Sequence, residues 1–96
     1  MITELALLTL RPDAAPAFET AFASVAGLLA GADGHLAHRL VRTLDHPDVY
    51  MLEVQWRDLA AHVDQFERSA EHARFLAAID AFLAAAPHVL HVPAHS

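Results

Sequence analysis

The stretch HLAHRLVRTLDHPDVYMLEVQW, residues 35–56, decides the fold of this chain. It contains two β-prone runs, His35–Leu44 and Val49–Trp56, separated by the polar segment Asp45–Asp48. Such runs are typical of strands, and a short segment that contains Asp and Pro is typical of a turn. We therefore expect these residues to form an antiparallel β-hairpin.

One strand and one helix are expected before the hairpin. Ile2–Leu10 is apolar and β-prone. Asp13 is a good N-cap for a following helix, with Pro16 tolerated in its first turn. The apolar stripe of that helix recurs at helical spacing and consists of Phe18, Phe22, Val25 and Leu29. Gly31–Gly34 ends the helix.

Two helices and a last strand are expected after the hairpin. Asp58 can cap a short helix that carries Leu59, His62, Val63 and Phe66 on one face. Ser69 can cap another, whose stripe is Phe75, Leu76, Ile79, Phe82 and Leu83. His88–Val92 follows Pro87 as a short strand. The order β-α-β-β-α(α)-β predicts an α+β fold, a ferredoxin-like split βαβ with a four-stranded antiparallel sheet. We expect residues 1–96 to form one such domain.

Both faces of the predicted sheet carry apolar side chains. If Leu44 pairs with Val49, one face of the hairpin carries Ala37, Val41, Tyr50, Leu52, Val54 and Trp56. The other face then carries Leu36, Leu40, Leu44, Val49 and Met51, with His38, Arg42, Glu53 and Gln55 between them. Helices cover only one side of such a sheet, and an open apolar face of this size is rare on a soluble monomer. We therefore expect a homodimer formed by sheet-to-sheet packing.

Composition excludes several classes of protein. The 96 residues include no cysteine and no lysine, and the formal charge is −6. These absences exclude disulfides, Cys-ligated metals, a Schiff base and a P-loop. Six scattered arginines are no footprint for nucleic acid or for an anionic membrane. The longest apolar run, Val25–Ala32, is far shorter than the roughly 20 residues of a membrane span. With no basic region at the N-terminus, we expect a cytoplasmic protein.

Trp56 and His62 are the first candidates for chemistry. Trp56 ends the third strand, and His62 follows six residues later on the predicted helix stripe. An imidazole beside an indole in an apolar cleft could act as a general base near neutral pH. The alternative is a core tryptophan and a histidine bonded to a backbone carbonyl. Arg39 is expected on the Trp56 side, where it could stabilise an oxyanion or extend along the sheet edge into solvent.

The histidines do not show the spacing of a metal site, although the chain has eight of them. His35 and His38 are three apart in a strand, as are His88 and His91, so each pair is expected to point to opposite faces. No two histidines stand at i, i+4 on a predicted helix. We therefore expect no bound metal.

Two ionisable residues interrupt the second face of the hairpin. His38 and Arg42 could line a cavity. Alternatively, His38 bonds across to Gln55 and Arg42 pairs diagonally with Glu53 at the dimer interface. The sequence leaves both possibilities open.

Several segments resemble the antibiotic biosynthesis monooxygenase family. They are HRLVR (38–42), DHPDVY (45–50), VQW (54–56), HVDQFERS (62–69), PHV (87–89) and FETAF (18–22). The resemblance covers nearly the whole chain and implies a dimeric α+β barrel, in which two ferredoxin-like sheets close on each other. It also implies a monooxygenase that oxygenates a small or polycyclic phenol or quinol with O₂ and without metal, flavin or nicotinamide. Other relatives cleave haem, act on signalling molecules or have no known activity.

The resemblance also suggests which residues form the site. Trp56 corresponds to the family's tryptophan at the end of the third strand. Monooxygenase members tend to have an Asn four residues before it and a Tyr six after it, where this chain has Leu52 and His62. We therefore expect His62 and Trp56 to be catalytic, no cofactor to be bound, and a small aromatic ligand to contact Arg39, Leu52, Phe66 and Phe75. A binding module that does not turn over its ligand and a haem-handling protein remain the alternatives.

Overall fold

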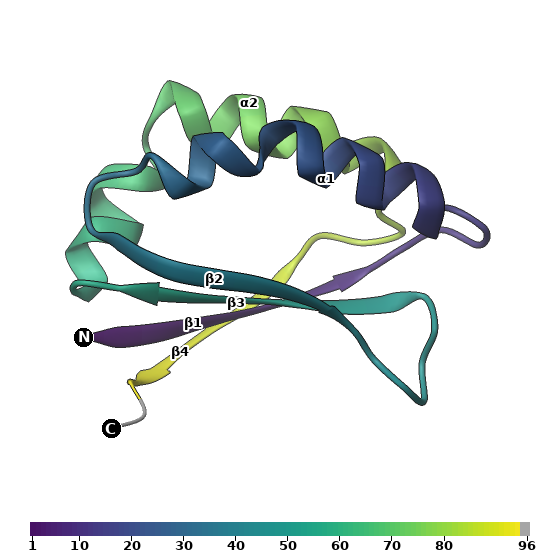
Figure 1. The fold of residues 1–96 in the computed structure, drawn as a ribbon, viewed down its shortest axis with the longest axis horizontal. Helices are drawn as coiled ribbons and strands as arrows, with labels where there is room; N and C mark the ends of the chain where they lie inside the picture. Colours follow the sequence, from purple (N-terminus) through teal and green to yellow (C-terminus); the bar gives the residue numbers. More distant parts are fainter. Residues whose placement is uncertain (95–96) are drawn as a thin grey trace.

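The computed structural model describes residues 1–94 and contains four strands and two principal helices. The elements in order are β1 (Ile2–Thr9), α1 (Ala15–Ala30), β2 (His35–Arg42), β3 (Val49–Trp56), the π-helical segment η1 (Ala61–Phe66), α2 (Ala70–Ile79), the 3-10 turn η2 (Asp80–Phe82) and β4 (His88–Pro93). Figure 1 shows α1 and α2 lying together over one face of the sheet. The predicted α+β ferredoxin-like fold is confirmed.

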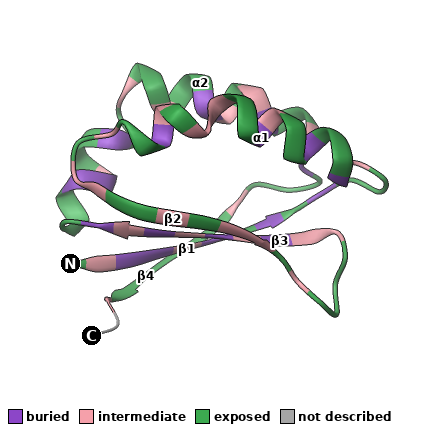
Figure 2. Cartoon of the chain, viewed as in Figure 1, coloured by how far each residue is buried: buried purple, intermediate pink, exposed green. Residues whose placement is uncertain are grey.

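The sheet is antiparallel throughout, with the strand order β2-β3-β1-β4. The central strands β1 and β3 alternate between buried and less buried residues, because only the face under the helices is covered (Figure 2). The most completely buried large side chains are Trp56, Phe18, Leu29, Ile79 and Val54. The core therefore lies between the helices and the central strands, and β2 and β4 are the edges.

The helix starts agree with the sequence at two of the three predicted caps. The Ser69 hydroxyl accepts a hydrogen bond from the His72 amide at 3.1 Å, and the Asp58 carboxylate accepts one from the Ala61 amide at 2.8 Å. The prediction for Asp13 is wrong: α1 starts one residue later than this cap requires, and Asp13 has a φ of +63°. Aspartate tolerates this left-handed conformation, so Asp13 turns the chain before the helix and does not cap it.

The hairpin pairs with a register one residue away from the predicted one. Arg42 lies opposite Tyr50, so the connection spans residues 43–48 and not only 45–48. Thr43 stabilises this longer connection, because both its amide and its hydroxyl donate to the Val49 carbonyl, at 3.0 and 2.9 Å. A slip of one residue moves every side chain of a strand to the opposite face. The residues of β2 that face the helices are therefore His38, Leu40 and Arg42, while Ala37, Arg39 and Val41 face away.

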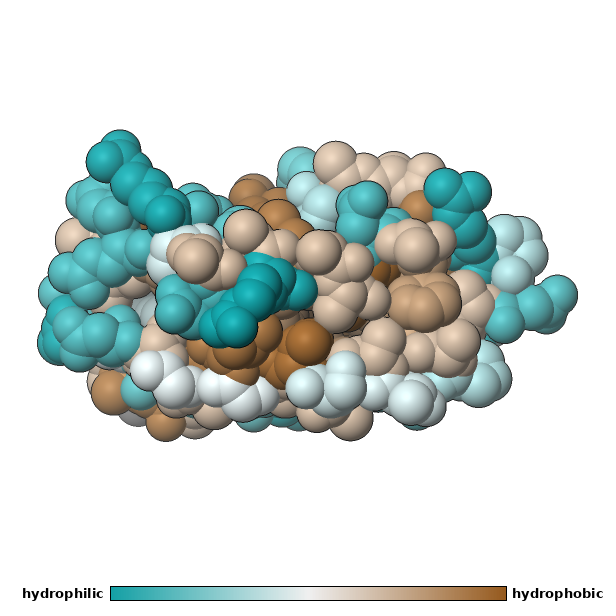
Figure 3. All heavy atoms as spheres, turned by 90° about the horizontal axis from the view of Figure 1, so that it is seen from above, coloured by the Kyte–Doolittle hydropathy of each residue, from teal (hydrophilic) through white to brown (hydrophobic). Residues whose placement is uncertain are grey.

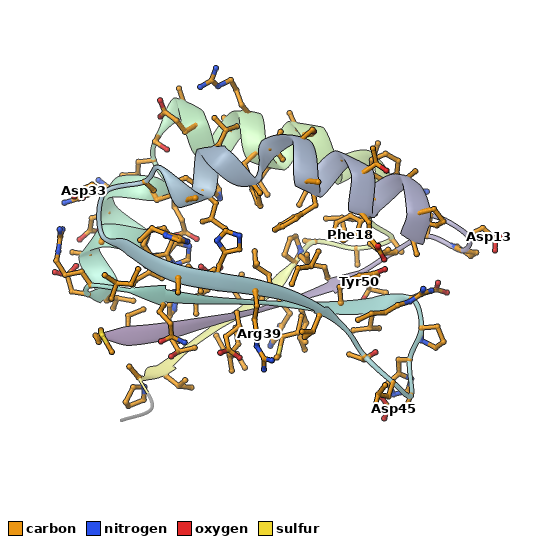
Figure 4. All side chains as sticks on the ribbon, viewed as in Figure 1. Asp13, Phe18, Asp33, Arg39, Asp45 and Tyr50 are labelled. Carbon is orange, nitrogen blue, oxygen red and sulfur yellow. The ribbon has the colours of Figure 1, made fainter. Side chains whose placement is uncertain are left out.

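The slip also changes the polar partners along β2. Arg39, not Arg42, lies 3.5 Å from the Glu53 carboxylate, and Figure 4 shows Arg39 pointing away from the helices. The Arg42 guanidinium instead donates to the Pro47 carbonyl at 2.7 Å. The His38 ring packs edge-on against Phe22, with 6.2 Å between the ring centroids. The predicted pairs of His38 with Gln55 and of Arg42 with Glu53 are therefore wrong.

An irregularity in β2 brings two histidines together. The register shifts between His35 and Ala37, so His35 and His38 lie on the same side of the strand. Their rings are joined by a 2.8 Å hydrogen bond between Nε2 and Nδ1. The expectation that they point apart is wrong, because a bulge breaks the alternation on which it rested. His88 and His91, in the regular strand β4, do lie on opposite faces.

The face of the sheet that points away from the helices carries an open row of apolar side chains. Leu7, Leu90 and Val92 are 39%, 50% and 39% exposed, and Leu5, Val41 and Met51 are half-buried beside them. In the part of the chain that the structure describes, no helix has both the length and the apolar character needed to cross a membrane.

Candidate active site

Trp56 and His62 meet under the helix layer. Trp56 is the last residue of β3 and faces the helices, where it is fully buried. The π-helical turn η1, closed by a 2.8 Å hydrogen bond from the Glu67 amide to the His62 carbonyl, directs His62 inward. The imidazole stacks on the indole with ring centroids 5.0 Å apart and planes 15° apart. Single π-helical turns occur frequently at functional sites.

Glu4 completes this cluster, and the sequence analysis missed it. The Glu4 carboxylate accepts a hydrogen bond from the Trp56 indole N–H at 2.9 Å, and His62 Nε2 lies 3.3 Å from the same oxygen. Glu4 is only 6% exposed. The sequence contained one signal for Glu4. Glu4, Ala6 and Leu8 alternate along β1 and share its inward face, so Glu4 is an acid in an otherwise apolar row. A charged residue in a buried register is uncommon without a partner.

Burial changes the acid–base behaviour of both groups. It raises the pKa of Glu4 to about 7, with a further rise from the nearby Glu67 charge, while the Trp56 hydrogen bond opposes the shift. Burial lowers the pKa of His62 to about 4, and the neighbouring His91 and His72 lower it further. His62 is therefore neutral at physiological pH, and the cluster member that titrates near neutrality is Glu4.

A cavity of about 180 Å³ lies between the sheet and α2 and reaches Glu4. Its apolar lining consists of Ala6, Leu8, Leu29, Leu52, Phe66, Phe75, Leu76, Ile79, Pro87 and Val89. Three ionisable residues also line it: Glu4, Glu67 and His72. Glu4 is the buried one of the three, whereas Glu67 is exposed and His72 is half-buried. The cavity therefore presents one buried carboxyl group to an apolar ligand.

The structure distributes the residues expected at the site over three places. Leu52, Phe66 and Phe75 line the cavity. Trp56 and His62 stand behind Glu4 and do not line the cavity themselves. Arg39 lies on the opposite face of the sheet, so the expectation that it shares the Trp56 side is wrong. The one-residue slip of β2 is the reason.

A second and larger hollow does not offer the same chemistry. Its volume is about 360 Å³, and it is lined by Gly27, Leu28, Gly31, Ala32, Asp33, Gln65, Phe66, Ser69 and Glu71. Its acids, Asp33 and Glu71, are both exposed. Figure 3 looks onto the helix side and shows hydrophilic residues towards both ends, with hydrophobic residues between them. We therefore assign the candidate site to the smaller cavity.

Among the described residues, no three His, Asp or Glu side chains are arranged to hold a metal ion.

Fold and site together define a small ferredoxin-like domain that presents a buried carboxyl group to an apolar cavity. The sequence model of the antibiotic biosynthesis monooxygenase family matches residues 1–78. The chain belongs to this family.

Three relatives illustrate the similarity. The uncharacterized protein YczJ of Bacillus subtilis is 30% identical over 91 residues, which is 95% of this chain and 96% of YczJ. A crystal structure of a protein from Bordetella bronchiseptica, named for the same family, is 26% identical with a TM-score of 0.94, and the match covers 99% and 97% of the two chains. SnoaB of Streptomyces nogalater, a cofactor-independent oxygenase solved as a mutant, is 22% identical with a TM-score of 0.80, covering 99% and 93%. At that identity, SnoaB shows the fold alone.

Proposed function

We propose that this protein is a cofactor-independent monooxygenase that oxidises a small quinol with O₂, and that Glu4 is its general base. The observation that carries the proposal is the position of Glu4. It is a buried carboxyl group with a pKa raised to about 7, and it lines an apolar cavity. A base whose pKa lies near the working pH is the most effective proton acceptor.

The size of the cavity favours a substrate with one ring. A dry protein cavity of roughly 150 Å³ holds benzene. The cavity beside Glu4, at about 180 Å³, therefore suits a monocyclic phenol or quinol better than a polycyclic one. The phenyl rings of Phe66 and Phe75 provide aromatic walls for such a ring.

Electron balance favours a quinol over a simple phenol. Inserting one oxygen atom of O₂ and reducing the other to water takes four electrons. A hydroquinone provides all four when it becomes a hydroxyquinone, since C₆H₆O₂ + O₂ gives C₆H₄O₃ + H₂O. A phenol that becomes a catechol provides only two and needs an external reductant. With a quinol, the reaction balances without flavin, metal or nicotinamide.

Three residues have separate roles in this proposal. Glu4 removes a phenolic proton, which leaves an electron-rich anion that reduces O₂. The indole N–H of Trp56 holds the Glu4 carboxylate at 2.9 Å. His62 stands beside the same oxygen at 3.3 Å as a neutral neighbour. This assignment moves the role of base from His62 to Glu4, because His62 does not line the cavity.

Oxygen uptake with methylhydroquinone and anthrone as probes tests the proposal. We expect the wild-type protein to consume O₂ with methylhydroquinone and to place one ¹⁸O atom from ¹⁸O₂ in the hydroxyquinone product. Anthrone, with three fused rings, is expected to react far more slowly. Glu4→Gln keeps the shape and the acceptor for Trp56 but removes the base, so turnover should fall about 10²–10⁴-fold. Equal rates for the wild type and Glu4→Gln would refute the role of Glu4.

One observation favours a second function, a binding module that does not turn over its ligand. The cavity wall has Leu52 where monooxygenase members tend to carry an Asn, so no side-chain amide is provided at that position. The same experiment separates the two functions. Saturable binding of methylhydroquinone without oxygen uptake above the protein-free rate would support the binding module.

A homodimer also forms part of the proposal. The exposed Leu7, Leu90 and Val92 give the outer sheet face an apolar surface that a second copy can cover, as in a dimeric α+β barrel. Such a surface is costly to leave in water at roughly 25 cal/mol per Å².

A further inference from the structure

Glu4 is nearly enclosed, although a general base must exchange a proton in each turnover. It is 6% exposed, and its open side faces a cavity lined mainly by apolar side chains. An apolar ligand in that cavity excludes water from this side of the carboxyl group. A base in this position needs a second path for its proton.

Two histidines lie in line behind Glu4. His62 Nε2 is 3.3 Å from Glu4 Oε1, and His62 Nδ1 is 2.8 Å from His91 Nε2. The three groups come from different elements: β1, η1 and the edge strand β4. His62 is buried, with 3% exposure, whereas His91 is exposed. One ring nitrogen of the buried His62 thus faces Glu4 and the other faces His91. His91, the outermost of the three, is exposed to water.

We propose that His62 and His91 form a proton relay that connects Glu4 to solvent at the edge of the sheet. The use of this relay in turnover rests on the proposed function, in which Glu4 takes a proton from the substrate. The geometry itself does not depend on any substrate.

The proton moves outward in three bond exchanges. The O–H bond of protonated Glu4 breaks as an N–H bond forms at His62 Nε2. The proton on His62 Nδ1 passes to His91 Nε2, and the proton on His91 Nδ1 leaves to water. Glu4 ends as a carboxylate, and both imidazoles end neutral in the opposite tautomer. The net result of this outward transfer is one proton released to solvent. Because the balanced reaction releases no proton overall, the same path run inward returns one proton when the second oxygen atom becomes water, and this also restores both tautomers.

The surroundings of His62 favour a concerted transfer over a charged imidazolium. Burial and the neighbouring histidines keep its pKa low. The ionisable groups packed around the relay from other segments are Glu67, whose carboxylate is 3.6 Å from His62 Nε2, and His72 of α2. Glu67 faces the nitrogen that already meets Glu4, so His62 Nδ1 stays directed at His91.

Nitrogen-15 NMR of the imidazole rings tests the relay without substrate. Trp56 is the only tryptophan, and its indole N–H donates to Glu4, so its signal reports the titration of that carboxyl group. We expect the Trp56 indole and His62 to change together with one midpoint near pH 7. His62 should switch tautomer there without becoming imidazolium. In Glu4→Gln the shared transition should vanish from both signals.

A matched control lies on the same strand. His88 is three residues before His91 and faces the other side of the sheet, so His88→Gln should leave the shared transition unchanged. A His62 ring that keeps one tautomer across the Glu4 midpoint would overturn the relay. So would a switch that persists in Glu4→Gln. Because this test needs no turnover, it can fail while the monooxygenase proposal stands, and the reverse also holds.

Chemical rescue gives a second readout. In the methylhydroquinone assay, His91→Ala should lower kcat at least tenfold with little change in KM, and added imidazole should restore kcat at this exposed position. A loss that imidazole does not restore would assign His91 a structural role and contradict the relay.

Discussion

The contributions of Glu4 and His62 to the pH dependence of stability are expected to cancel in the wild type and to appear, with opposite signs, in two variants. The cause is a proton that changes its site on folding. Near pH 5.5 the unfolded chain carries it on His62 and has an ionised Glu4. The folded chain carries it on Glu4 and has a neutral His62, because burial raises the pKa of Glu4 to about 7 and lowers that of His62 to about 4.

The sign for each residue follows from which state holds more protons. Glu4 moves from an ordinary 4.5 to about 7, so its contribution to the free energy of unfolding is full below pH 4.5 and is lost as the pH rises to about 7. The pKa of His62 moves from 6.5 to about 4. Its contribution to the free energy of unfolding is therefore full above pH 6.5 and is lost as the pH falls to about 4, because the unfolded state binds the proton more readily. At about 1.4 kcal/mol per pKa unit, each effect amounts to about 3 kcal/mol. The two slopes oppose each other between pH 4.5 and 6.5.

Urea unfolding at a fixed protein concentration, followed by far-UV circular dichroism from pH 4 to 8, measures these slopes. In Glu4→Gln only His62 remains, so stability should rise with pH by about 3 kcal/mol from pH 4 to 6.5 relative to the wild type. In His62→Gln only Glu4 remains, so stability should fall by a similar amount from pH 4.5 to 7. Comparing slopes and not absolute stabilities removes the packing cost of each substitution.

The control is Glu71→Gln. Glu71 is exposed and is not among the groups that shift the pKa of Glu4 or His62, so the wild-type pH profile should be preserved. If Glu4→Gln loses stability with rising pH and His62→Gln gains it, folding favours the charged form of each remaining group and not its neutral form. If both variants keep the wild-type slope, neither group is perturbed by burial. Either result would refute the reasoning.

Three further expectations concern the site and the assembly. Trp56→Phe removes the N–H that stabilises the Glu4 carboxylate, so the pKa of Glu4 should rise. The midpoint of the increase of kcat/KM with pH should therefore shift to higher pH by about one pH unit or more, and an unchanged profile would argue against Glu4 as the base. Met51→Glu and Leu90→Glu, on the outer sheet face, should convert a dimer of twice 10.4 kDa into monomers in sedimentation equilibrium, while Leu44→Glu, at a fully exposed loop position, should not. The purified protein should contain no stoichiometric metal, flavin or haem by elemental analysis and absorption spectroscopy, and a bound cofactor in either measurement would contradict the proposed reaction.

Introducing a charge at Leu40 is not a test of the dimer, although the predicted hairpin faces suggested it. Leu40 lies opposite Leu52 on the side covered by helices. A charge there would destabilise the core and not the outer face, so loss of assembly at this position would carry no information about the interface. Met51 remains suitable, because it lies opposite the exposed Leu7.

The local order of elements could be predicted from the sequence because short-range patterns determine it. The alternation in β3, the stripe of Phe18 and Phe22 and the cap at Ser69 depend on neighbours a few residues away. Trp56 and His62 could also be predicted as a pair from the sequence. They are only six residues apart, at the end of a strand and in the helical turn that follows it, so both side chains can lie under the helices. The family resemblance suggested Leu52, Phe66 and Phe75 as ligand contacts, and all three lie on apolar patterns that the sequence shows, Leu52 in β3, Phe66 in η1 and Phe75 in α2.

Tertiary structure alone decided the rest. The face of β2 depends on whether Thr43 belongs to the strand or to the connection, and hydrogen bonds to Val49 decide this. Glu4 meets Trp56 across 52 residues of sequence, and its raised pKa arises from the helices that bury it, which the sequence of β1 does not contain. His91 reaches His62 only because β4 pairs with β1 at the sheet edge. Sequence periodicity reports which elements form, whereas the shared cavity and the acid–base character of its carboxyl group arise only when distant elements pack together.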